Sequence, residues 1–139
     1  MYKTIIGQIQ TILEGITAIK SVYAYPLDGT PKTFPSVIFY PDTIENMYNT
    51  NQENKKTLKF KMWIVVNLAG TNEEQVFTSI LPNAVDEVVE EFDNKWSSML
   101  GGRRSWMVID SGIWGFSEEN NSKTAYAELS LTYEFTNSV

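Results

Sequence analysis

One group of residues in this sequence carries the letters of a metal-dependent nuclease motif. Pro41-Asp42 is followed further along the chain by Glu53-Asn54-Lys55. In such nucleases two carboxylates converge on Mg²⁺ with a lysine beside the attacking water, so these groups must project together from a rigid strand. Here Glu53 and Lys55 stand in an asparagine-rich polar stretch, which is typical of a solvated hairpin loop. We therefore reject the nuclease interpretation.

Other residues that could do chemistry lack partners in the sequence. The chain has no Cys and no His, which excludes thiol catalysis, cysteine zinc sites and the usual general base at neutral pH. Asp110 could be a buried functional acid, but no base accompanies it, so we interpret it as a partly buried structural acid. No nucleophile elbow or glycine-rich phosphate loop is present. We expect no catalytic residue, no cofactor and no metal site.

Length and charge limit the class of protein. A chain of 139 residues with 42% hydrophobic residues suits one folded domain over residues 1–139. The net charge of −6 does not suit the cationic surface that sequence-independent binding of nucleic acid needs. There is no apolar run of about 18 residues for a membrane span, and no secretory signal pattern at the N-terminus. We expect a soluble protein, made and used in a cytoplasm, with no membrane partner.

Apolar periodicity predicts the elements of the first half of the chain. A helix near the N-terminus has one apolar face, formed by Ile5, Ile9, Ile12, Leu13 and Ile16. Extended runs follow at 19–25 and 34–40, separated by a turn that ends in Asp28-Gly29. The clearest strand alternates from Thr57 to Leu68, which is long for a globular protein. We interpret this length as a strand whose outer half leaves the core of the monomer.

The polar segment between these strands is a candidate assembly element. From residue 44 to 56 it is rich in Asn and Gln, so we expect a mobile polar loop or hairpin that becomes ordered when subunits assemble. Met47 and Tyr48 are its apolar anchors, and lysines at its base, including Lys59 and Lys61, could meet an acidic surface on a neighbouring subunit.

The second half of the chain predicts a helix and then two strands. Thr71-Asn72-Glu73-Glu74 is typical of a capping box, and apolar residues keep helical spacing from there to Trp96. Pro82 lies inside this pattern, so we expect a kink or a break there. Alternation at 105–116 and 124–136 indicates an antiparallel hairpin. The element order predicts an α+β fold, a mainly antiparallel sheet with two helices packed on one face.

Several side chains are candidates for an oligomer or partner interface. Trp63 and Trp114 stand on the expected polar sides of their strands, and exposed aromatic rings are characteristic of interfaces. The helix after Asn72 holds the excess negative charge, which indicates a solvated face or a site for a basic partner. Arg103 and Arg104 could touch phosphate, although we prefer two solvated arginines after a helix end. The full candidate set is Met47, Tyr48, Asn49, Asn51, Lys59, Lys61, Trp63, Asp86, Glu90, Asp93, Arg103, Arg104 and Trp114.

The elements follow one another in a recognisable order along nearly the whole chain. After the amphipathic helix come Val22-Tyr23-Ala24-Tyr25-Pro26 and then Phe34-Pro35-Ser36-Val37-Ile38-Phe39. An Asn/Thr-rich loop, the basic and apolar strand at 59–66, an acidic helix and two C-terminal strands complete the series. This order resembles the tail-terminator, or tail-completion, proteins of long-tailed bacteriophages.

The resemblance implies a structural virion protein without catalytic residues, located at the head-proximal end of the tail and assembled in the host cytoplasm. Its subunits would form a homo-oligomeric ring, expected to be a hexamer, that caps the tail tube protein and joins the head connector or neck protein. DNA would pass through the ring without specific binding. The alternatives are a phage neck or head-closure subunit, a tail tube protein, or a small-molecule binding protein or enzyme unrelated to phages.

Overall fold

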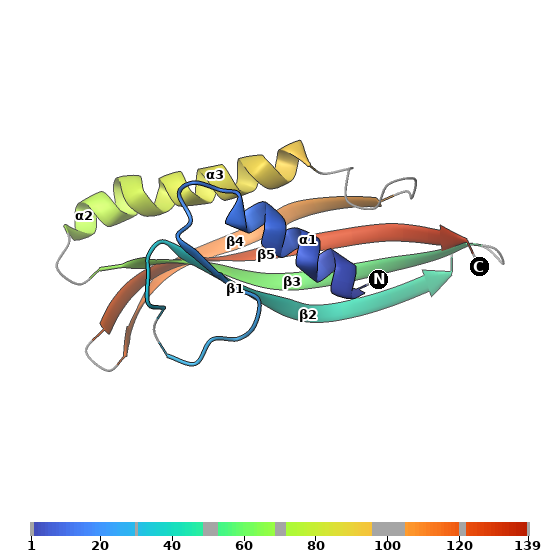
Figure 1. Cartoon of the computed structure of the whole chain (residues 1–139), viewed down its shortest axis with the longest axis horizontal. Helices are drawn as coiled ribbons and strands as arrows, with labels where there is room; N and C mark the ends of the chain where they lie inside the picture. Colours follow the sequence, from blue (N-terminus) through green and yellow to red (C-terminus); the bar gives the residue numbers. More distant parts are fainter. Residues whose placement is uncertain are drawn as a thin grey trace.

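The core element of this protein is a five-stranded sheet in the order β1-β2-β3-β5-β4. The computed structural model (Figure 1) describes residues 2–29, 31–48, 53–68, 72–95, 105–119 and 122–138. The strands are β1 (Ser21–Tyr23), β2 (Ser36–Tyr48), β3 (Glu53–Asn67), β4 (Ser105–Glu119) and β5 (Ser122–Ser138). β1 runs parallel to β2, and the other three pairs are antiparallel.

Two helical segments pack on this sheet. The first is α1 (Tyr2–Glu14); the second consists of α2 (Glu73–Gln75), the π-helical turn η1 (Val76–Ile80) and α3 (Leu81–Asn94). Figure 1 shows the second segment as one long helix, with α1 on the same side of the strands. The apolar residues of both segments join those of the sheet in one core cluster. The predicted α+β fold, with both helices on one face of a mainly antiparallel sheet, is confirmed.

The central strand β3 shows how one face of the sheet becomes the core. Its even-numbered residues from Leu58 to Leu68 are all buried, whereas Lys59, Lys61 and Trp63 are partly exposed. Successive side chains of a strand point to opposite faces, so one face of β3 packs under the helices. The neighbouring β5 repeats the pattern with its odd-numbered residues. We call the two sides of the sheet the helix-covered face and the helix-free face.

The polar segment at 44–56 belongs largely to paired strands. β2 continues to Tyr48 and β3 begins at Glu53, and the two pair through Tyr48 opposite Asn54. Of the two alternatives, a polar loop or a hairpin, the described residues agree with the hairpin, and Glu53 to Lys56 are strand where a solvated loop was one interpretation. From Asn54 to Val65, β3 lies between β2 and β5, so its backbone groups have partners on both sides there. Asn54 is only 6% exposed, although we expected the amide side chains of this segment to face water.

The second helix begins where the capping box predicts. The Asn72 side chain accepts hydrogen bonds from the backbone N–H groups of Glu74 (3.0 Å) and Gln75 (3.4 Å). These bonds satisfy two of the donors that a helix start leaves without partners. The capping box thus predicted the place of the first turn, but the cap is Asn72, one residue after the threonine of that motif, and the helix is described as far as Asn94.

Pro82 neither breaks this helix nor ends it. It lies in the first turn of α3, directly after the π-helical turn, in which the Leu81 N–H donates to the carbonyl of Val76, five residues earlier. A proline inside an α-helix lacks a donor, and its ring clashes with the carbonyl four residues before it. A π turn accommodates an irregularity of this kind without interrupting the helix. The alternative of a break into two pieces is therefore wrong.

Removal of the Phe92 ring should destabilise the whole domain. Phe92 is fully buried in the core on α3, so Phe92→Ala should lower the free energy of unfolding by about 3–5 kcal/mol. Asn83→Ala is the matched control, because Asn83 is exposed on the same helix and should change this free energy by less than about 0.5 kcal/mol. Urea denaturation measures both. An equal effect of the two variants would contradict the packing of α3 on the sheet.

Candidate functional site

The residues of the nuclease-like motif do not converge. Asp42 lies at a β-bulge of β2, between the residues paired with Phe60 and Lys59, whereas Lys55 pairs with Met47. At about 3.3 Å per residue the two are about 15 Å apart along the sheet. The Lys55 ammonium instead lies 3.4 Å from the Glu134 carboxylate. Our reason for rejecting the motif, a loop before the strand, was wrong, because Glu53 and Lys55 are part of β3.

Asp110 is an exposed residue of a second β-bulge. The pairing of β4 with β5 shifts between Ile109 and Ser111, which leaves Asp110 as the extra residue. It is exposed, and its Oδ2 accepts a hydrogen bond of 2.8 Å from the Thr132 hydroxyl. The expectation of a partly buried acid is corrected accordingly. The acid fixes the bulge to the neighbouring strand and has no catalytic partner among the contacts described.

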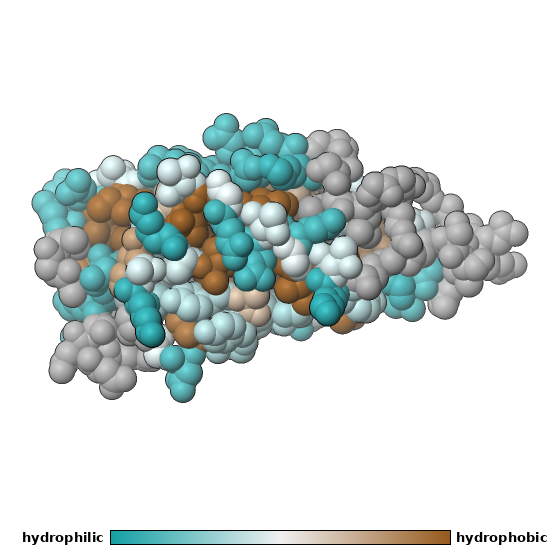
Figure 2. Space-filling model, in the orientation of Figure 1, coloured by the Kyte–Doolittle hydropathy of each residue, from teal (hydrophilic) through white to brown (hydrophobic). Residues whose placement is uncertain are grey.

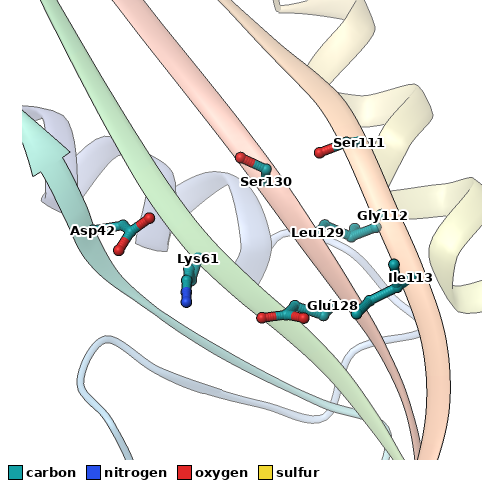
Figure 3. Close-up of a pocket in the computed structure, with 8 residues that line it drawn as sticks. All are labelled: Asp42, Lys61, Ser111, Gly112, Ile113, Glu128, Leu129 and Ser130. Atoms are coloured by element: carbon teal, nitrogen blue, oxygen red, sulfur yellow. The ribbon is translucent and has the colours of Figure 1, made fainter.

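A shallow pocket of about 180 Å³ lies across four strands (Figure 3). In Figure 3, Asp42 and Glu128 lie on opposite sides of Lys61, and Ser111 and Ser130 complete the polar lining. The one lysine of the lining thus lies between two carboxylates. No group of three or more His, Cys, Asp or Glu side chains that could hold a metal ion occurs within the described residues. The pocket supports neither a catalytic set nor a metal site.

Trp63 and Trp114, which the sequence singles out together, occupy different environments. Trp63 lies on the helix-free face, where its ring packs against Tyr40 with 5.3 Å between centroids, and it is only partly exposed. Trp114 is 53% exposed, on the edge strand β4. Trp63 is thus supported within its own subunit, and Trp114 is the stronger interface candidate.

The edge strand β4 carries a group of exposed apolar side chains around Trp114. Phe116 is 70% exposed, and Ile113 is also exposed. Trp114 pairs with Ala127 and Phe116 with Ala125, and both alanines are buried under the helices. Directly paired residues share a face, so both rings point to the helix-covered face, beyond what the helices cover. Within the described part of the chain no strand lies on the outer side of β4.

The opposite edge of the sheet is formed by β2. β1 pairs with β2 only along Ser36–Ile38, so the rest of β2 has an open outer side among the described residues. Ile44 on this part is 56% exposed and pairs with the buried Leu58, so it too points to the helix-covered face. These two strands hold four of the six large apolar side chains that are exposed in the described residues. We call the outer sides of β4 and of β2 after Ile38 the open edges.

Two glycines of β4 are in close contact with side chains of the neighbouring strand β5. A Cβ on Gly112 would lie 2.6 Å from Leu129 Cδ2, and one on Gly115 would lie 2.7 Å from the Tyr126 hydroxyl. The Leu129 and Tyr126 side chains therefore lie over the glycines, as aromatic residues often do over glycines at sheet edges. A side chain at either position would therefore require Leu129 or Tyr126 to move.

The charged candidates lie on opposite sides of the subunit. Asp86, Glu90 and Asp93 are exposed on α3, and Figure 2 shows hydrophilic residues along the outer surface of this helix. Lys59 and Lys61 lie on the helix-free face. The sheet separates the two sets, so they cannot form one site within a subunit.

The remaining candidates fall partly or wholly outside the described residues. The backbones of Met47 and Tyr48 belong to β2, but their side chains are not described. Asn49, Asn51, Arg103 and Arg104 lie outside the described residues altogether. Sequence reasoning missed Ile44, Ile113 and Phe116. A usable signal for the last two was the run Ile113-Trp114-Gly115-Phe116, which places apolar residues on both sides of one strand.

Comparisons with known proteins do not identify a family for this chain. No protein-family model matches the chain, and no curated protein matches it either. Among the described helices none is both long and apolar enough to cross a membrane.

The separation of Asp42 from Lys55 predicts that the protein does not cleave DNA. Supercoiled plasmid should remain intact with Mg²⁺, as gel electrophoresis would show. The variant Asp42→Ala/Lys55→Ala should lose at most about 1 kcal/mol of unfolding free energy, because the Lys55–Glu134 pair is partly exposed. Mg²⁺-dependent cleavage by the native protein that disappears in this variant would overturn the structural interpretation of these residues.

Proposed function

We propose that this protein is a structural virion subunit, a tail terminator that caps the tail tube of a long-tailed phage as a homo-oligomeric ring. The observation that carries the proposal is the pair of open edges, which hold most of the exposed large apolar side chains described. Soluble proteins normally protect such strands, because they invite pairing with other chains. An open edge on each side of one sheet gives a subunit two different contact surfaces, and repeated contact between different surfaces generates rings.

The charge distribution supports a channel that does not hold DNA. The whole chain has a net charge of −6, and phosphate binding needs a cationic surface. On the helix-free face the lysines alternate with acids: Lys55, Lys59 and Lys61 with Glu45, Glu128 and Glu134. We propose that DNA passes through the ring without specific contact, and that the two ends of the ring meet the tail tube protein and the head connector or neck protein.

The proposed position in the virion is tested by labelling the protein on purified tails. Antibody or gold labelling of purified tails, viewed by electron microscopy, should mark the head-proximal end only. Label along the whole tube would indicate a tube protein, and label on tail-less heads would indicate a head-closure subunit. Either result would replace the terminator role.

The proposed ring predicts a specific effect of β4 substitutions on assembly. Native mass spectrometry at tens of micromolar should show a closed oligomer, expected to be a hexamer. Trp114→Ser/Phe116→Ser should yield monomer, because the double variant lacks the two aromatic side chains whose apolar surface association would bury.

Tyr25→Ser is the matched control, because Tyr25 is 52% exposed but lies outside both open edges. It should leave the oligomer intact. A native protein that stays strictly monomeric, even when tail tubes are present, would count against the ring.

A further inference from the structure

We infer that successive copies of this chain join by sheet extension, the free part of β2 in one copy adding antiparallel to β4 of the next. Ile44 of the first copy then packs against Trp114 and Phe116 of the second. This inference rests on the proposed ring and specifies its subunit contact.

The two open edges match in length. β2 lacks an outer neighbour from Phe39 to Tyr48, because β1 stops at the pair Tyr23–Ile38. Among the strands that the structure describes, β4 lacks one throughout, and after its bulge it continues from Ser111 to Glu119. Each edge offers backbone N–H and C=O groups in a row, and another strand is the natural partner for such a row.

The directions of the strands also match. β2 is antiparallel to β3, β3 to β5, and β5 to β4. β2 and β4 therefore run in opposite directions within a subunit. When copies repeat around a ring with their strands in the same sense, β2 of one copy meets β4 of the next in antiparallel orientation, the more stable form of pairing.

Three of the exposed apolar side chains of the open edges, Ile44, Trp114 and Phe116, lie on the same face of such an extended sheet, whereas Ile113 pairs with Glu128 and lies on the other face. Ile44 pairs with Leu58, Trp114 with Ala127, and all of these point to the helix-covered face. In a continuous sheet, side chains that share a face meet across the junction. Ile44 then stands opposite Trp114 or Phe116, the two exposed apolar residues of β4 on that face, and these side chains cover one another.

Sheet extension between unlike edges gives the backbone groups at both open edges of every copy hydrogen-bond partners. A two-fold pairing of β4 with β4, or of β2 with β2, leaves the other edge of each subunit open. Among assemblies that repeat a single kind of contact, only the unlike contact leaves no open edge, and where the repeat closes it forms a ring with no free strand.

Cysteine cross-linking tests this contact directly, because the native chain contains no cysteine. Ile44→Cys protein, mixed with Trp114→Cys or Phe116→Cys protein under mild oxidation, should form a disulfide-linked dimer. Cα atoms of directly opposite residues in antiparallel strands are about 4.5–5.5 Å apart, within the range that a disulfide spans. Each variant alone should remain uncross-linked, as should Tyr25→Cys mixed with either β4 variant.

The outcomes distinguish failure of the proposed subunit contact from failure of the proposed ring. A dimer in the mixed sample alone supports unlike pairing, and the better of the two β4 positions gives the register. Dimers formed by a single variant overturn it in favour of two-fold pairing. If the reduced variants form rings in native mass spectrometry and yet fail to cross-link when mixed, the contact is wrong and the ring stands. Failure of the native chain to form any oligomer, with or without tail tubes, overturns both.

Amide hydrogen exchange on the native chain provides a second readout that needs no substitution. On assembly, the outward-facing amides of residues 39–48 and 111–119 should become protected. Amides of β3 should not change, because β3 already has a neighbour on both sides. Equal exchange at both open edges in monomer and ring would contradict sheet extension.

Discussion

Burial of one face of the sheet under two helices is the interaction on which the rest of this structure depends. β3 and β5 supply alternating apolar residues to that face, and α1 and α3 close over them. Each fully buried Leu, Ile or Phe contributes about 1.5–3 kcal/mol. The helix-free face has no such cover, so its side chains support one another: Trp63 packs on Tyr40, and the Trp106 Nε1–H donates to Glu134, which also meets Lys55.

Packing on one face alone does not protect the edges of a sheet. The helices cover the middle strands, but the backbone of β4 and the free part of β2 stay open at the sides. Each edge has a β-bulge, at Asp42 and at Asp110. Bulges are a usual device against unwanted pairing. The apolar side chains Ile44, Trp114 and Phe116 lie C-terminal to these bulges, where β2 and β4 continue with regular pairing. This placement favours pairing of these two segments with another strand over general aggregation.

The sequence predicts the parts of this fold that depend on local periodicity. The strict alternation of β3 and β5, the helical spacing in α1 and the Asn72 cap all identify elements that short segments determine by themselves. Long-range pairing was less predictable. Glu53 to Lys56 looks like a loop but forms strand because β2 and β5 pair with it on both sides. The exposure of Phe116 depends on how far the helices reach over β4, and Ile113 is exposed because it points to the helix-free face. No short segment contains that information.

The shape of the subunit decides which face a ring of this kind turns inward. A helix adds a layer about 10 Å thick to one side of the sheet. In a ring made by sheet extension the outer circumference is longer than the inner one, so the thicker side fits outside. The helix-free face then lines the channel, with its lysines interleaved among acids. In such a ring the exposed acidic residues Asp86, Glu90 and Asp93 of α3 would face outward, where their charge would favour solubility of the assembly.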